Sequence, residues 1–337
     1  MATFNFDWKE NFCLSFLERP PSILVRNKKG TGCNTCGDIS FLISLSRRRG
    51  PVMNRKKIQV YFDSVAHWYD ETRTIPDFVI QEAFSIINDR IHLGESRVIL
   101  DAGIGTGRTC RPLSRYTDGL VGLDISPEML RNCLERNRDE ISEGKIVLIR
   151  GDITHLPFRS STFDVIIGMH VFEFIRKLRA GVRKKATKEI KRVVKPEGLL
   201  IIMSYSNPPR ETIVAKKYRK QHRRCSVRAK ERLIWIFNSL VPESVFEKVV
   251  RALYHRSFRF IEKSATSVQM ERVVWKQKVQ IAQILKILEK RIYSDYFNTP
   301  DKTHNIIMKK LRKWIEKEGL NDYEEVECNL EMRIIKF

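Results

Sequence analysis

A glycine-rich segment restricts the fold of this chain more than any other feature. Residues 97–108 read RVILDAGIGTGR, so that a short apolar run ends in Asp101 and glycines follow at positions 103, 105 and 107. Glycine lets the backbone pass close to a ligand and adopt the positive φ that a tight turn needs. A buried strand that ends in such a turn predicts a nucleotide-binding loop in an α/β protein.

The spacing of these glycines argues against a dinucleotide site. In the fingerprint GxGxxG, the sixth position packs the helix against the strand and is normally Gly or Ala. Counted from Gly103, that position is Arg108. An NAD-dependent enzyme is therefore the weaker alternative.

Acidic residues follow three of the apolar runs that we expect to form strands. These residues are Asp101, Asp124 and Asp152. The carboxyl ends of parallel strands meet at one edge of an open α/β sheet, and ligands bind at that edge. Any one of the three could be an ordinary solvated acid, but together they favour a ligand site. An ionised carboxylate at the end of the second strand can accept hydrogen bonds from both hydroxyls of a ribose.

A chain with these motifs resembles the class I S-adenosylmethionine-dependent methyltransferases. The pattern D-x-G-x-G-x-G corresponds to motif I of that family, and residues 151–158 (GDITHLPF) are similar to its G-D-x-x-x-L-P-F stretch. Residues 60–73 (VYFDSVAHWYDETR) resemble the F-D-x-x-A-x-x-Y-D pattern of the ubiquinone and menaquinone biosynthesis C-methyltransferase group. The specific motifs cover residues 53–207. Glu197 departs from the Pro-Gly-Gly turn that is usual in the family.

The resemblance implies both a fold and a cofactor. The fold is α/β, a Rossmann-like seven-stranded and mostly parallel sheet with helices on both faces and an inserted helical cap. The cofactor is S-adenosylmethionine, with Asp101 near its methionine amine, Asp124 on its ribose, and Asp152 with Ile153 at its adenine. The implied cofactor-binding residues are Tyr69, Asp101, Gly103, Gly105, Gly107, Asp124, Ile125, Asp152 and Ile153.

His170 is the candidate catalytic residue. It lies in the apolar run 163–171, which we expect as the fourth strand, where the family places residues that face the substrate. An imidazole titrates near neutral pH and can take a proton from a substrate oxygen or acidic carbon. The alternative is a packed or hydrogen-bonded histidine without a catalytic role.

No metal site is predicted. Cys33 and Cys36 form a C-x-x-C pair, but structural zinc needs four ligands and no second pair lies nearby.

Composition and spacing divide the chain into four parts. Residues 1–52 are an N-terminal extension with little periodicity, and a native start at Met53 is one hypothesis, because residues 47–50 (RRRG) are what a translated ribosome-binding sequence encodes. Residues 53–95 are expected to form a helical lid. Residues 96–207 and 264–337 form the methyltransferase core. Residues 208–263 are a basic, then amphipathic, helical insertion that is expected to cap the substrate pocket.

The formal net charge of +22 indicates attraction to polyanions. The motifs favour methyl transfer to a small-molecule or lipid-like acceptor. The basic segment 216–232 keeps two further partners open, RNA as the acceptor and an anionic membrane surface. A module that binds S-adenosylmethionine without catalysis is a less favoured alternative.

The remaining composition predicts a cytoplasmic protein with no obligate protein partner. No apolar run approaches the roughly 18–20 residues that span a bilayer. The first twenty residues lack the continuous apolar core of a secretory signal. The seven cysteines are scattered and odd in number, which is typical of reduced thiols.

Overall fold

The computed structural model describes residues 55–94, 98–177, 180–225, 258–293, 296, 299–320 and 322–337. They belong to one compact unit, Pro51–Phe337. The N-terminal extension with its C-x-x-C pair, the possible start at Met53 and the apolar half of the 208–263 insertion lie outside the described residues.

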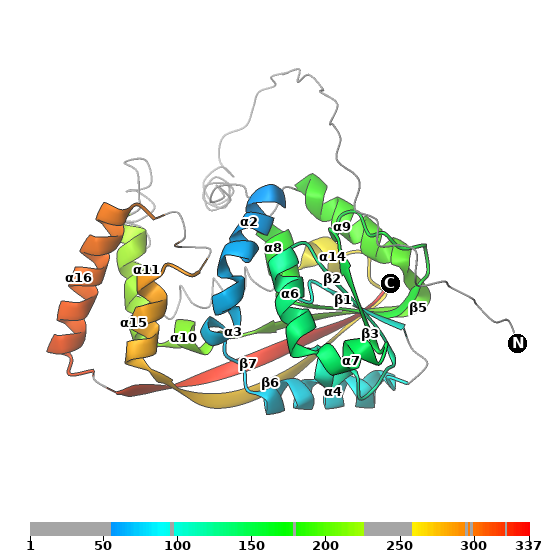
Figure 1. Cartoon of the computed structure of the whole chain (residues 1–337), viewed down its shortest axis with the longest axis horizontal. Coiled ribbons are helices and arrows are strands. Elements are labelled where there is room, and N and C mark those ends of the chain that lie inside the picture. The colour runs from blue at the N-terminus through cyan, green and yellow to red at the C-terminus, as the bar shows by residue number, and fades with distance from the viewer. Residues whose placement is uncertain are drawn as a thin grey trace, which may run out of the picture. The chain divides into compact units, whose positions relative to one another are not determined.

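Seven strands form one sheet in this part of the chain, in the order β3-β2-β1-β4-β5-β7-β6. The first five strands are parallel, β7 runs antiparallel to β5, and β6 runs antiparallel to β7. The prediction of a seven-stranded, mostly parallel sheet is therefore confirmed (Figure 1). The strands are β1 (Val98–Ala102), β2 (Gly119–Asp124), β3 (Ile146–Arg150), β4 (Phe163–Met169), β5 (Val194–Tyr205), β6 (Ser267–Gln280) and β7 (Tyr323–Lys336).

Helices cover both faces of the sheet because successive side chains of a strand point to opposite sides. On β4, Val165 and Ile167 belong to one buried apolar cluster, whereas Ile166 belongs to another. The helices are α2 (Arg55–Val65), η1 (Ala66–Trp68), α3 (Tyr69–Thr72), α4 (Asp77–Ile91), α5 (Cys110–Leu113), α6 (Pro127–Arg136), α7 (Arg138–Ser142), α8 (Val171–Lys177), α9 (Ala180–Val193), α10 (Pro208–Glu211), α11 (Ile213–Cys225), α14 (Arg259–Glu262), α15 (Ile281–Glu289) and α16 (Asp301–Lys317). None of these helices is long and apolar enough to cross a bilayer.

Two strands differ from the sequence-based expectation. The fifth strand begins at Val194, and the expected turn at Pro196-Glu197-Gly198 lies inside it as an irregularity in the register with β4. A Cβ on Gly198 would lie 2.8 Å from the carbonyl oxygen of Asp164, so glycine permits this close approach. The edge strand β6 was not predicted, because only Val273, Trp275 and Val279 of its residues are buried, and exposed residues such as Lys276 and Lys278 lie between them.

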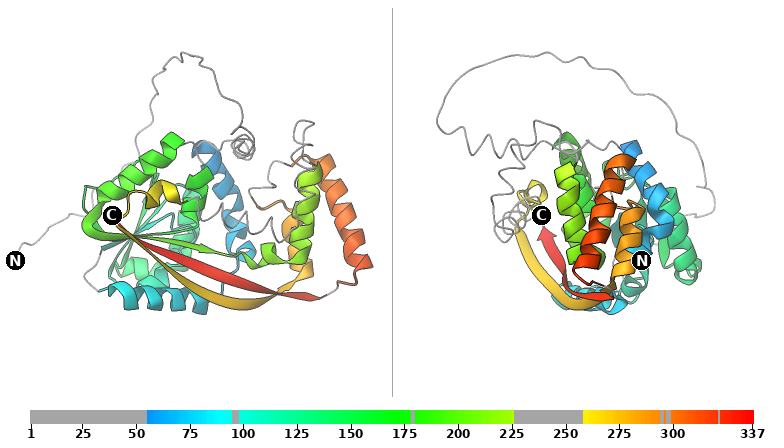
Figure 2. Two further views of the ribbon diagram at one scale, coloured as in Figure 1. Left: turned by 180° about the vertical axis from the view of Figure 1, so that it is seen from behind. Right: turned by 90° about the vertical axis from the view of Figure 1, so that its left-hand side faces the viewer.

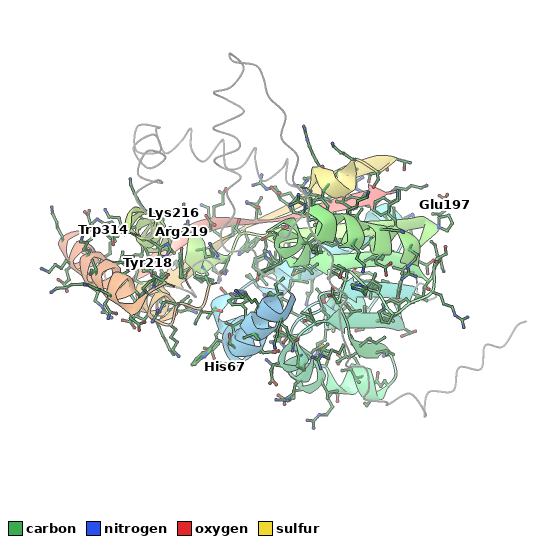
Figure 3. All side chains as sticks on the ribbon, turned by 90° about the horizontal axis from the view of Figure 1, so that it is seen from above. His67, Glu197, Lys216, Tyr218, Arg219 and Trp314 are labelled. Carbon is green, nitrogen blue, oxygen red and sulfur yellow. The ribbon has the colours of Figure 1, made fainter. Side chains whose placement is uncertain are left out.

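Helices α11, α15 and α16 pack together near the ends of the long strands β6 and β7 (Figures 1 and 2). Helix α11 follows β5, whereas α15 and α16 lie between β6 and β7, in the segment expected as core. Figure 3 shows Lys216, Tyr218 and Arg219 of α11 beside Trp314 of α16. We call these helices the three-helix group. A capping role for the insertion over the substrate stays a prediction.

A buried histidine in the three-helix group predicts pH-dependent stability. The Nδ1 atom of His304 lies 2.8 Å from the Tyr218 hydroxyl. Burial, assisted by the charge of Arg291, lowers the pKa of His304 below its usual value of about 6.5. The unfolded chain therefore binds more protons below about pH 6.5, and this contribution to stability is lost as the pH falls below that value.

Replacement of His304 by Phe should flatten the acid side of the curve of melting temperature against pH, relative to the unmodified protein. Each 1 kcal/mol of lost stability lowers the melting temperature by roughly 2–4 °C for a chain of this size. His67→Gln is the control because His67 is exposed. Equal slopes in the unmodified protein and the His304 variant would contradict the assignment.

Candidate functional site

The glycine loop connects β1 to α5 and lies at the carboxyl edge of the sheet. Gly103, Gly105 and Gly107 have φ values of 90°, 56° and 74°. The backbone N–H of Gly103 donates to the Leu123 carbonyl at 2.7 Å, which holds the loop against β2. A Cβ on Gly107 would lie 2.4 Å from the Cys133 sulfur. Only glycine satisfies both the dihedral angle and the close approach at this position.

Asp101 lies at the carboxyl end of β1 and is 1% exposed. Its Oδ2 accepts a hydrogen bond from the Thr109 hydroxyl at 2.5 Å, whereas Oδ1 has no hydrogen-bond partner among the described residues. Burial raises the pKa of Asp101 to about 7 against the opposing effect of the Thr109 hydrogen bond. A buried carboxyl oxygen without a partner fits a cationic ligand group such as an ammonium.

Asp124 ends β2 and supports the loop from the neighbouring strand. Its Oδ2 accepts from the Gly105 N–H and its Oδ1 accepts from the Ser126 N–H, both at 2.9 Å. Burial raises the pKa of Asp124 to about 6, although these backbone hydrogen bonds oppose the rise. A carboxylate at this place can also accept hydrogen bonds from ribose hydroxyls.

The third predicted acid follows β3. Asp152 accepts a hydrogen bond from the Thr154 N–H at 2.8 Å. Ile153 beside it is 9% exposed and belongs to the same apolar cluster as Leu123 of β2. The structure thus brings Asp101, Asp124 and Asp152 to the same edge of three neighbouring strands.

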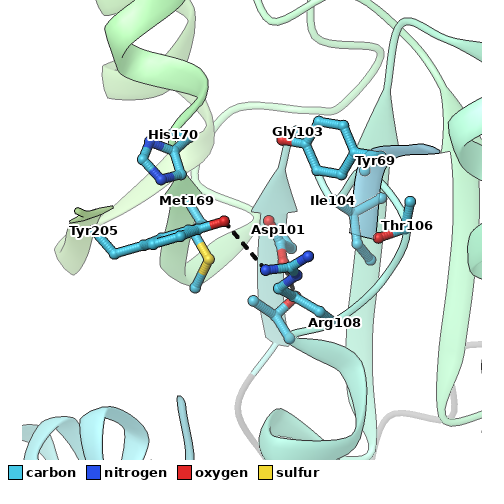
Figure 4. A pocket seen from close by; sticks show the side chains of 11 residues that line it. Tyr69, Asp101, Gly103, Ile104, Thr106, Arg108, Met169, His170 and Tyr205 are labelled. Atoms are coloured by element: carbon cyan, nitrogen blue, oxygen red, sulfur yellow. Dashed lines mark hydrogen bonds between the residues drawn. The ribbon is translucent and has the colours of Figure 1, made fainter. Parts of the chain in front are cut away.

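A small pocket opens over the glycine loop (Figure 4). Five predicted residues line it, namely Tyr69, Asp101, Gly103, Gly105 and His170. The other predicted residues, Gly107, Asp124, Ile125, Asp152 and Ile153, are not part of its lining. Lining residues that were not predicted include Thr106, Arg108, Thr109, Met169 and Tyr205.

Arg108 is the most informative residue that sequence reasoning missed. Its guanidinium donates to the Asp70 carboxylate at 2.6 Å and to the Arg73 carbonyl at 2.7 Å. It also donates to the Tyr205 hydroxyl at 3.2 Å (Figure 4). The residue that departs from the dinucleotide fingerprint therefore joins the glycine loop to α3 and β5.

Asp70 is the centre of this connection. It accepts hydrogen bonds from the Thr106 hydroxyl at 2.8 Å and from the Arg136 guanidinium. Burial acts to raise the pKa of Asp70, but the charges of Arg108 and Arg136 outweigh it and hold the pKa below its usual value. We call Asp70, Thr106, Arg108 and Arg136 the Asp70 cluster. Asp70 lies in the F-D-x-x-A-x-x-Y-D pattern, which was the one available signal for it.

Tyr69 of α3 and His170, which follows β4, both line the pocket. The Tyr69 ring also faces the Arg73 guanidinium, 4.3 Å from its centroid. His170 has a φ of 62°, which is uncommon for a residue other than glycine and is frequent at functional sites. Its Nδ1 lies 3.1 Å from the Glu173 carboxylate, and its ring meets the Tyr205 ring edge-on at a centroid distance of 4.3 Å.

The described residues contain no group of three or more His, Cys, Asp or Glu side chains that could hold a metal ion.

Known methyltransferases are similar to this chain over the region that contains the glycine loop. Residues 100–202 match a family described as "Methyltransferase domain". A demethylmenaquinone methyltransferase of Tropheryma whipplei is 31% identical over 166 residues, which are 48% of this chain and 64% of that protein. The ubiquinone/menaquinone biosynthesis C-methyltransferase UbiE of Wigglesworthia glossinidia brevipalpis is 30% identical over 156 residues, 45% of this chain and 60% of that protein.

A solved structure with a similar fold is YcgJ of Bacillus subtilis. Its TM-score is 0.44 at 16% identity, and the comparison covers 76% of this chain and 99% of that chain. The chain spans somewhat under two thirds of the length of the curated relatives described above. The matched region runs from β1 to β5, the strands that carry the glycine loop, the three acids and His170. Residues 100–202 of this chain therefore form a methyltransferase domain, and S-adenosylmethionine is the cofactor that this assignment implies.

Proposed function

We propose that this protein transfers a methyl group from S-adenosylmethionine to a small or lipid-like acceptor of the quinol class. The observation that carries the proposal is that His170, in contact with Glu173 and Tyr205, lines the same pocket as Asp101 and the glycine loop. The acceptor class is supported by two relatives that are described as a demethylmenaquinone methyltransferase and a ubiquinone/menaquinone C-methyltransferase.

In this proposal the predicted residues hold the cofactor at the carboxyl edge of the sheet. Asp101 binds the α-ammonium group through Oδ1, and Asp124 binds the ribose hydroxyls. Asp152 and Ile153 contact the adenine, and Tyr69 covers the pocket. When bound, the cofactor supplies an electrophilic methyl group on a sulfonium. The protein mainly aligns the acceptor with that methyl and excludes water.

His170 acts as the general base in this scheme. The Glu173 carboxylate accepts a hydrogen bond from the Nδ1–H group and so orients Nε2 towards the acceptor, as an acidic partner does in other histidine pairs. Nε2 then takes the proton of an acceptor hydroxyl, and the electron pair that remains makes the ring carbon nucleophilic. The ring carbon would take the methyl group as the bond from that methyl to sulfur breaks, which leaves a ring ketone. The ring carbon would then lose its own proton to solvent, and His170 would return its proton to the acceptor oxygen.

His170→Ala should lower kcat by roughly 10²- to 10⁴-fold because general-base assistance is lost. Glu173→Gln should lower kcat less, since the amide still accepts a hydrogen bond from Nδ1. The assay follows labelled methyl from S-adenosylmethionine into a reduced, short-chain demethylmenaquinone. His67→Ala is the control because His67 is exposed. Activity of His170→Ala within about twofold of the unmodified protein would make His170 a packing residue.

The acceptor class is tested by methyl transfer into fractionated extract. Label that moves into organic solvent supports a quinol or another lipid-like acceptor. Label that is released by nuclease would show that the acceptor is RNA and not a quinol. RNA is the alternative that the basic helix α11 favours. Cofactor binding without any transfer would indicate a non-catalytic module.

We also propose a cytoplasmic location. Cys110, Cys133 and Cys328 are free and buried, which supports a reducing compartment.

A further inference from the structure

Nearly half of the net charge of the chain is concentrated on the three-helix group. Helices α11, α15 and α16 together carry thirteen Lys and Arg residues but three Asp and Glu residues, out of a net charge of +22 for all 337 residues. This density far exceeds that of the rest of the chain, so it does not follow from a uniformly basic composition.

The charges of α16 lie on the side that faces solvent. The opposite side of the helix, which includes His304, Ile307, Leu311 and Ile315, is buried against its neighbours. Residues 302, 306, 309, 313 and 317 are exposed and follow one another at spacings of three and four, which places them in a single stripe. We call Lys302, Ile306, Lys309, Lys310, Lys313 and Lys317 the basic face.

The acids near this face are outnumbered by its lysines. Asp301 is paired with Arg291 at 2.5 Å, and Glu289 is paired with Arg312. Glu316, the other acid of α16, is exposed on the same side of the helix, seven positions after Lys309, and the five lysines of the basic face still leave this side positive. Lys217 of α11 lies over the Trp314 ring at 4.4 Å from its centroid and extends the positive surface beyond α16.

We propose that the basic face docks on the anionic surface of a lipid bilayer. Each Lys or Arg near such a surface adds attraction, and the sum decays within a Debye length. Ile306 is 44% exposed in the middle of the lysine stripe and supplies an apolar anchor for the headgroup region. The lone aromatic residue of α16, Trp314, is half-buried beneath Lys217, so within this described helix nothing exposed is available for base stacking. This favours lipid over RNA.

Docking brings the enzyme to a lipid-like acceptor that is dissolved in the bilayer, and this purpose rests on the proposed function. Docking itself needs neither cofactor nor acceptor. Its failure and the failure of the proposed function are therefore distinguishable.

The test is co-sedimentation of the full chain with vesicles, measured without cofactor. We expect binding to phosphatidylcholine vesicles that contain phosphatidylglycerol at low salt, and little binding to phosphatidylcholine alone. Binding should weaken at least tenfold between about 50 mM and about 500 mM salt, because the Debye length shortens. Equal binding to both kinds of vesicle, or none to either, would overturn the proposal.

Two triple variants locate the surface. Lys309→Glu, Lys310→Glu and Lys313→Glu together should weaken binding to the anionic vesicles at least tenfold. The control carries the same charge change on α9, at the exposed residues Lys184, Lys188 and Lys191. It should retain most of the binding. An equal loss in both variants would show that total charge, and not the basic face, drives the association.

Ile306→Ser tests the apolar anchor. It should weaken the binding that remains at high salt and leave the salt-sensitive part in place. The same proteins are then titrated with a single-stranded RNA. Binding to RNA that depends on the α16 lysines, together with no binding to anionic vesicles, would overturn the proposal in favour of a nucleic-acid surface.

Discussion

Cofactor affinity should increase as the pH rises through about 7, and Asp101→Asn should remove most of this increase. Burial raises the pKa of the Asp101 carboxyl to about 7, so the group is largely protonated in the ligand-free protein at pH 6. A cationic ammonium stabilises the ionised form and therefore binds with release of a proton below pH 7. If only the ionised form binds, affinity falls about 25-fold between pH 7.5 and pH 5.5.

Titration calorimetry with S-adenosylhomocysteine measures this dependence, and buffers of different ionisation enthalpy count the protons released. The free ligand has its own ionisable amine, but this amine titrates equally in the experiments with both proteins. The comparison with Asp101→Asn therefore isolates the carboxyl. Parallel curves of affinity against pH for the two proteins would place the ammonium elsewhere.

The same raised pKa has the opposite effect on the ligand-free protein. The folded state holds a proton on Asp101 between about pH 4 and pH 7, whereas the unfolded chain does not. This contribution to stability is present at low pH and is lost as the pH rises through about 7. Bound cofactor should therefore raise the melting temperature more at pH 8 than at pH 6.

Asp124→Ala should weaken cofactor binding by about 1.5–3 kcal/mol, or roughly 10- to 150-fold. The change removes the proposed ribose contacts, and it also leaves the N–H groups of Gly105 and Ser126 without their acceptor. Asp124→Asn should lose less, because its single carbonyl oxygen still accepts. Binding is measured by calorimetry, with circular dichroism to check that each variant is folded.

Asp118→Ala is the matched control for this prediction. Asp118 is an exposed acid just before β2, at the end of the strand away from Asp124. Its replacement should leave affinity unchanged. Unchanged affinity in Asp124→Ala would remove Asp124 from the ribose site.

Sequence alone determined the core of this protein from the glycine loop to β4. Each strand there is a short apolar run, and each ends close to an acid or a glycine turn, so the signal is contained in about ten neighbouring residues. Parallel strands then require that Asp101, Asp124 and Asp152 share one edge. For this reason their proximity followed from local pattern without knowledge of any long-range contact.

Only the tertiary structure decided what surrounds that edge. The Asp70 carboxylate meets Arg108 across 38 positions of sequence, and the Tyr205 hydroxyl meets Arg108 across 97. Arginine, aspartate and tyrosine side chains can pair with many partners, so residue type does not specify which pair forms. Likewise, α11 and α16 come together from separate connections of the sheet, because the apolar side of each needs a partner to exclude water. The Asp70 cluster and the basic face exist only after that packing is complete.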